Sequence, residues 1–280
     1  MSTNRSAWPI FVGTAFLMLL SLPVARAQQD SSAANMEQCN NASSVELQIR
    51  GCTALLKTQG FNAKVLSFAY NNRGNAFSIQ GQDDLAIQDY DKAINLNPNF
   101  AKPLNNRGVA YRKRGEYDRA IQDFNAALVV DPNYLDAFAN RAETYKDKGD
   151  YRSALQDLDR AVSLQSSSGA LWNERCWIRG TVGELQGALS DCNEAIRLEP
   201  KRATRFNTRG FTYLKSQQWD LAIADFNVAL QIDTKLASAL YGRGYAKQKK
   251  GDATGAKSDI AAAKAIKKDV EAEFAVYGVQ

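Results

Sequence analysis

A tetrapeptide with arginine in its third position returns at a constant interval through most of this chain. Its first copy is Asn71-Asn72-Arg73-Gly74, and each later copy begins 34 residues after the one before, without insertion or deletion. A fixed period of this size is typical of one supersecondary unit stacked on copies of itself. Each unit leaves an apolar face that only a neighbour can bury, so the period predicts an array with a long binding surface. The arginines are Arg73, Arg107, Arg141, Arg175, Arg209 and Arg243.

Aligned at this period, the copies share columns of small residues. Such residues, placed on both sides of a glycine-containing turn, are what two closely crossing antiparallel helices require. Larger apolar residues fill the positions between them, and Pro98, Pro132 and Pro200 end the second helix of their repeats. The small columns run from Gly74 to Gly244, from Ala86 to Ala256 and from Ala93 to Ala263.

These columns resemble the tetratricopeptide repeat family, in its exported bacterial form with six full repeats. The resemblance implies an all-α fold, a right-handed α-solenoid of antiparallel helix pairs whose first helices line a concave face. Residues 39–66 fit a partial repeat that caps the N-terminal end, and residues 271–280 fit a helix that caps the C-terminal end. The six repeats are 67–100, 101–134, 135–168, 169–202, 203–236 and 237–270.

The first 27 residues are predicted to direct export as a signal peptide. Arg5 precedes an apolar run from Ile10 to Leu22, and Ala25-Arg26-Ala27 is a small-x-small cleavage site. An uncleaved anchor is the alternative, although the run is short for a membrane span. We expect a protein of the periplasm of a Gram-negative-type bacterium, or a secreted one, without stable membrane insertion after cleavage. Residues 28–38 read as a disordered lead-in.

Composition argues against several classes of function. The chain has no histidine, which removes the commonest general base and metal ligand. Its 35 basic and 30 acidic side chains are interspersed, so nucleic acid is not an expected partner. We find no metal cluster, phosphate-binding loop or spare domain in the sequence. The prediction is a non-enzymatic protein without cofactor or metal.

Four cysteines in an exported chain suggest two disulfides. Cys176 stands in a small-residue column, and Cys192 stands in the aromatic column of the second helix of the same repeat. Both columns face one helix crossing, so a bridge is expected. The same alignment pairs Cys39 with Cys52. Redox catalysis is the alternative, but neither pair has the C-x-x-C spacing.

An aspartate follows each repeated arginine after 16 residues. One salt bridge inside each repeat explains both columns, and a charged stripe for an ionic ligand is the functional alternative. Both columns stop together at the ends of the array, so pairing within repeats leaves no charge without a partner. We predict the pair Arg73–Asp89 and its copies. The aspartates are Asp89, Asp123, Asp157, Asp191, Asp225 and Asp259.

The residue before the arginine is asparagine in the first three repeats. This resembles the asparagine ladder of some tetratricopeptide proteins, whose amides bind the backbone of an extended peptide. A primary amide both donates and accepts, which suits a peptide bond of any sequence. Solvated asparagines without a role are the alternative. The predicted polar end of the groove contains Asn72, Asn75, Asn106, Asn140, Arg112 and Lys146.

Aromatic residues stand two positions after the arginine in the last three repeats, at Trp177, Phe211 and Tyr245. They would form a stacking platform in the groove or, alternatively, pack against the adjacent repeat. The carboxylate clamp of chaperone-tail receptors is not expected, because its basic positions hold Asn71, Asp136 and Asn140 here.

The sequence therefore predicts a scaffold of the bacterial cell envelope that binds an extended peptide or partner protein in its concave groove. A glycan-binding module, with peptidoglycan as the ligand, and a self-assembling structural protein are the alternatives. The identity of the partner and the oligomeric state stay open.

Overall fold

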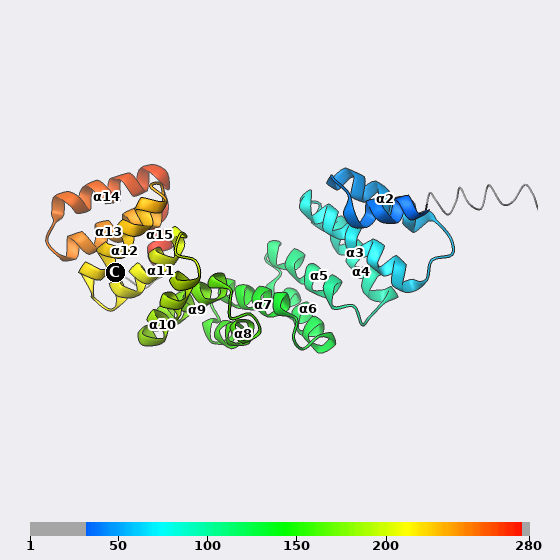
Figure 1. Cartoon of the computed structure of the whole chain (residues 1–280), viewed down its shortest axis with the longest axis horizontal. Coiled ribbons are helices and arrows are strands. Elements are labelled where there is room, and N and C mark those ends of the chain that lie inside the picture. Colours follow the sequence, from blue (N-terminus) through cyan, green and yellow to red (C-terminus); the bar gives the residue numbers. More distant parts are fainter. Residues whose placement is uncertain (1–31, 276–280) are drawn as a thin grey trace, which may run out of the picture. The chain divides into compact units, whose positions relative to one another are not determined.

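A computed structural model describes residues 32–275, and every regular element in that range is helical (Figure 1). The predicted signal peptide and residues 276–280 lie outside the described residues. Among the described helices, none is both long and apolar enough to span a bilayer. The chain divides into two compact units, Met1–Ala110 and Tyr111–Gln280, which we describe separately.

The first unit begins with a helix over residues 32–41, followed by three labelled helices. Ser44 caps the first of these by accepting a hydrogen bond from the Leu47 amide, and Asn62 caps the next through the Val65 amide. This second cap starts the helix before residue 67, where the first full repeat was expected. The helices are α2 (Val45–Lys57), α3 (Ala63–Ile79) and α4 (Asp83–Leu96), and α5 (Ala101–Lys113) contains the boundary between the units.

The expected disorder of residues 28–38 is wrong for residues 32–38, which are helical. Two contacts explain the order. Cys39, at the end of this helix, is bonded to Cys52 of α2. Met36 packs against a buried cluster that includes Leu55 and Ala69. The polar composition of the segment gave no indication of these two contacts.

The second unit stacks helix pairs that correspond to the predicted repeats (Figure 1). Tight turns join the helices of each pair, and Gly115, Gly149, Gly183 and Gly251 adopt positive φ there. Gln217 takes this backbone conformation in the repeat that lacks the glycine. The helices are α6 (Tyr117–Val130), α7 (Leu135–Asp147), α8 (Tyr151–Leu164), α9 (Gly169–Val182), α10 (Leu185–Leu198), α11 (Ala203–Lys215), α12 (Trp219–Ile232), α13 (Ala237–Lys249) and α14 (Ala253–Ile266).

Small residues allow the two helices of a pair to approach closely. A Cβ atom added to Gly210 would lie 2.7 Å from the ring of Phe226, and one added to Gly74 would lie 2.7 Å from the ring of Tyr90. The columns of small and large residues are therefore two halves of one contact.

The C-terminal helix α15 (Val270–Ala275) departs from the regular stack. First helices here pack on the first helix of the adjacent repeat, as α11 does with α9 and α13. The ring of Phe274 instead reaches past α13 and lies 5.2 Å from that of Phe211 on α11. We call the side of the second unit formed by α7, α9, α11 and α13 the first-helix face. Helix α15 lies against this face, where it packs on α13 and its Phe274 also reaches Phe211 of α11.

Candidate partner-binding site

The repeated arginines hold each repeat together from within. The Arg175 guanidinium donates to Asp191 through Nε at 2.8 Å and through Nη2 at 2.7 Å, and the Asp191 side chain is 2% exposed. Two parallel bonds of this kind fix the geometry of the pair. The same bidentate contact joins Arg73–Asp89, Arg141–Asp157, Arg209–Asp225 and Arg243–Asp259. Arg107 and Asp123 belong to different units, and their pair stays a prediction.

Each of these arginines also reaches the preceding repeat, which the sequence analysis missed. Arg175 Nη1 donates to Asp159 at 2.8 Å, and Arg209 Nη1 donates to Asn193 at 2.7 Å. The signal was present in the sequence, because an Asp or Asn recurs two residues after the aspartate column and gives way to Ala261 in the last repeat. The remaining contacts are Arg73–Thr53, with the N-terminal partial repeat, and Arg107–Asp91, Arg141–Asn125 and Arg243–Asn227.

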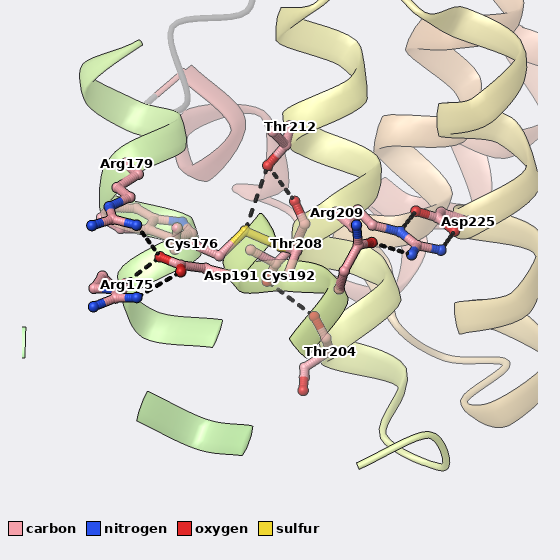
Figure 2. The surroundings of a disulfide bond; sticks show 12 residues. Arg175, Cys176, Arg179, Asp191, Cys192, Thr204, Thr208, Arg209, Thr212 and Asp225 are labelled. Atoms are coloured by element: carbon pink, nitrogen blue, oxygen red, sulfur yellow. Dashed lines mark hydrogen bonds and ion pairs between the residues drawn. A yellow bond between two sulfur atoms is a disulfide. The ribbon is translucent and has the colours of Figure 1, made fainter. Parts of the chain in front are cut away.

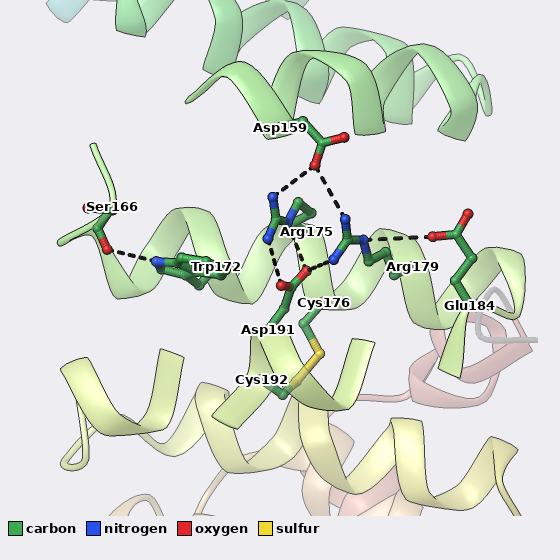
Figure 3. Close-up of polar contacts among 9 residues, drawn as sticks. All are labelled: Asp159, Ser166, Trp172, Arg175, Cys176, Arg179, Glu184, Asp191 and Cys192. Atoms are coloured by element: carbon green, nitrogen blue, oxygen red, sulfur yellow. Dashed lines mark hydrogen bonds and ion pairs between the residues drawn. A yellow bond between two sulfur atoms is a disulfide. The ribbon is translucent and has the colours of Figure 1, made fainter. Parts of the chain in front are cut away.

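The fourth repeat carries a second arginine in this network (Figure 3). Arg179 donates to Asp191 at 2.9 Å and to Asp159 at 3.4 Å, so two guanidinium groups share both carboxylates. In the sixth repeat Lys247 donates to Asp259, so this carboxylate also binds two cations, Arg243 and Lys247. Arg179 and Lys247 replace the tyrosine or phenylalanine that other repeats have at this position, and they are bound within the array.

Burial and neighbouring charges shift the pKa values of two of these aspartates in opposite directions. Burial raises the pKa of Asp157 above its ordinary value, against the opposing effect of Arg141. Burial acts in the same direction on Asp259, but the hydrogen bonds and charges of Arg243 and Lys247 outweigh it, so the pKa of Asp259 is lowered.

Both cysteine pairs form disulfides. Cys176 and Cys192 join α9 to α10, with their Cα atoms 5.4 Å apart, and both are fully buried. The bridge occupies the place where Gly210 meets Phe226 in the next repeat. Figure 2 shows Thr212 of α11 beside it, with its Oγ1 3.7 Å from Cys176 Sγ. Cys39 and Cys52 are equally buried, so both bridges are structural.

In the first unit the predicted asparagine ladder is bonded within the protein. Asn106 Nδ2 donates to Asn71 Oδ1 at 3.1 Å and to Asn75 Oδ1 at 2.8 Å. Asn72 Nδ2 donates to Asn40 Oδ1 at 3.0 Å and to the carbonyl of Cys39. These amides tie each first helix to the preceding repeat, so they have little capacity left for a peptide.

The ladder loses its donors in the second unit. Asn173 and Asn207 stand in the same column as Asn71, yet their Oδ1 atoms are buried without a hydrogen-bond partner. The residue that should donate to them from the following repeat is Thr208 or Gly242. Thr208 donates to its own helix, at the carbonyl of Thr204, and glycine has no side chain.

The predicted cations of the groove are also paired. Arg112 donates to Asp147 at 2.8 Å and to Glu143 of α7. Lys146 pairs with Glu174 of α9, and Asn140 is half-buried on α7. These contacts between successive first helices neutralise both cations.

The expected stacking platform is wrong for Phe211, which is 2% exposed. Its ring lies between Phe226 and Phe274, with centroids 5.4 Å and 5.2 Å away. The other two rings are half-buried and pack against the preceding repeat. Trp177 contacts Tyr151, and Tyr245 contacts Trp219. Aromatic side chains so close together bury one another instead of presenting their faces to a sugar.

Comparisons with known proteins agree with this architecture. Models of the tetratricopeptide repeat match residues 74–113, 101–134 and 135–168. No curated protein matches the chain in sequence. A tetratricopeptide repeat protein from Parabacteroides merdae is 18% identical, with a TM-score of 0.66 over 90% of this chain and 99% of its own.

Two further structures share the fold at similar identity. MamA from Desulfovibrio magneticus is 19% identical, with a TM-score of 0.57 over 64% of this chain and 99% of its own. YrrB, described as a repeat protein with an unusual peptide-binding site, is 21% identical, with a TM-score of 0.53 over 68% of this chain and 96% of its own. The chain contains tetratricopeptide repeats over residues 74–168, and these repeats and the shared fold support a protein–protein interaction scaffold.

Proposed function

We propose that this chain is an exported, non-enzymatic scaffold that binds a segment of a partner protein on the first-helix face of its second unit. One observation carries the proposal. A short segment of the chain itself, α15, already lies on this face with Phe274 against Phe211. A surface that holds one peptide segment has the shape and chemistry to hold another.

The first unit is the weaker candidate for this role. Its asparagine amides are used between neighbouring helices, as Asn106 shows. In the second unit Trp177 of the first helix α9 is half-buried, so part of this residue stays accessible to a partner. We therefore assign the partner to the second unit instead of the asparagine ladder.

Site-specific photo-crosslinking tests this assignment. A photoreactive phenylalanine analogue replaces Trp177 on α9 in one variant and Val129 in the control, because Val129 is 82% exposed on the second helix α6. We expect crosslinks to one recurring protein from position 177 and not from position 129. Equal crosslinking from both positions, or none from position 177, would contradict the proposal.

Export is supported by the two buried disulfides, since such bridges persist in oxidising compartments. Alkaline phosphatase, which needs its own disulfides for activity, reports on this step when fused to the C-terminus. We expect activity from the fusion with residues 1–27 and none from the fusion without them. Equal activity from both fusions would contradict export by this segment.

A further inference from the structure

We propose that Phe211, Tyr241 and Tyr245 form an anchor site for a phenylalanine of a partner segment, and that α15 occupies this site until the partner displaces it. The proposal rests on the function proposed above and names the chemistry of the ligand. The segment would be one acidic helical turn with an aliphatic residue and a phenylalanine four positions apart. We call the three residues the ring site.

The ring site holds Phe274 from three directions. Its ring centroid lies 4.8 Å from that of Tyr241, 5.2 Å from that of Phe211 and 5.3 Å from that of Tyr245. Two of these rings come from α13 and one from α11, so the site needs two adjacent repeats. Phe274 is 4% exposed, as deep as a core residue.

The seated segment defines the pattern of the ligand. Val270, one turn before Phe274, is 1% exposed, so both side chains point from one face of α15 into the protein. Glu271 pairs with Lys264 of α14 at 2.6 Å. The segment therefore presents a carboxylate to a cation of α14, and a partner segment with an acidic residue at this position would meet the same cation.

Helix α15 is held by few contacts. It has six residues, far fewer than a helix needs to persist by itself in water. Its ion pair with Lys264 is exposed on both sides and contributes little. Glu271 also forms a hydrogen bond with Tyr241, and Val270 and Phe274 supply the apolar part of the attachment. A ligand with the same two side chains would make equivalent contacts and could take their place.

A second observation on the same part of α11 is a buried acceptor without a donor. Asn207, one turn before Phe211, is 7% exposed, and its Oδ1 is buried without a hydrogen-bond partner. Burying such an acceptor unpaired is costly. A longer partner segment would bring donors that α15 does not supply here.

Peptide competition in the full-length protein tests the proposal. The probe is a fluorescein-labelled peptide of residues 268–275, and its control carries alanine in place of phenylalanine. We expect the variant Phe274→Ala to bind the probe at least tenfold more tightly than the wild type, because its own helix no longer competes. The alanine peptide should bind neither protein. Equal affinity of the two proteins, or of the two peptides, would overturn the proposal.

Hydrogen exchange of the wild-type protein provides a measurement that does not depend on the folding of a variant. Saturating probe should speed exchange in α15 and slow it in α11 and α13. Protection of α15 that does not change while the probe is bound would overturn displacement. A wild-type dimer in light scattering that the probe dissociates would show that the occupant is a second copy, which also overturns the proposal. Crosslinking from Trp177 does not depend on α15, so the two proposals can fail separately.

Discussion

Asparagines in two adjacent columns of the repeats differ in their hydrogen bonding, although the sequence shows the same residue type. Asn106 donates to two carbonyl oxygens, whereas Asn173 Oδ1 has no partner. We predict that Asn106→Ala lowers the free energy of unfolding by about 1–3 kcal/mol, because Asn71 Oδ1 loses this donor and Asn75 Oδ1 keeps only the Tyr90 hydroxyl. The matched variant Asn173→Ala should change it by less than about 0.5 kcal/mol. Urea denaturation of both variants checks this, and equal losses would show that the ladder does not bind across repeats.

Two aspartates in equivalent pairs should respond to pH in opposite directions. The pKa of Asp259 is lowered below 3.8, so the stability from its ionisation is present above that value and is lost as the pH falls through the lowered pKa. The pKa of Asp157 is raised above 3.8, so its contribution is present at low pH and is lost as the pH rises through the raised pKa.

Comparison of Asp259→Asn with Asp157→Asn therefore gives a signed test. Between about pH 3.5 and pH 6, the loss of stability caused by Asp259→Asn should increase, and the loss caused by Asp157→Asn should decrease. Urea denaturation at both pH values measures the two losses. If both losses change in the same direction with pH, Lys247 does not make the pKa of Asp259 differ from that of Asp157. In the Lys247→Met background, the loss of stability caused by Asp259→Asn should depend on pH more as the loss caused by Asp157→Asn does.

Close helix crossings set the cost of adding one methyl group at the level of the helix pair. A Cβ at Gly242 would lie 2.5 Å from the ring of Phe226, which is fully buried and also faces Gly210. Gly242→Ala should lower stability by about 1–3 kcal/mol, because the ring has no room to move. The control is Gly180→Ala, where the nearest atom is Thr212 Oγ1 at 3.4 Å. It should be neutral or stabilise by up to about 1 kcal/mol. Thermal melts of both variants check this, and similar effects would contradict the packing argument.

The sequence predicted the helix pairs well because their requirements are local and repeat. Glycine opposite an aromatic ring, and Arg73 sixteen residues before Asp89, recur at one spacing, so alignment alone places them in contact. The position of α15 was not predictable in this way. Phe274 continues the first-helix columns by number, but where it packs depends on which apolar surface the returning chain finds. Burial of Phe211 depends on that same contact, which is why the expected platform failed.

At the scale of the whole molecule, stability in a repeat array is a sum of repeat terms and contacts between nearest neighbours. The arginines other than Arg107 fit this description, since each of them contacts its own repeat and the one before it, as Arg175 does with Asp191 and Asp159. The disulfides are placed at separate points of the array, one in each compact unit. Loss of one bridge should therefore be felt locally and fade with distance along the chain.

Hydrogen exchange of two cysteine variants measures this locality. Cys39→Ala with Cys52→Ala should speed exchange in α2 and α3 and leave α11 to α14 unchanged. Cys176→Ala with Cys192→Ala removes the second disulfide. In the chain-entropy model, a disulfide that closes a loop of this length stabilises the folded state by about 3 kcal/mol. This variant should speed exchange in α9 and α10 first, then in α8 and α11, with α2 and α3 unchanged. If either variant speeds exchange evenly through all helices, the chain unfolds as one cooperative body, and the nearest-neighbour description does not apply to it. A graded response would instead mean that the ring site of the fifth and sixth repeats can open to exchange α15 for a partner while the remaining repeats stay folded.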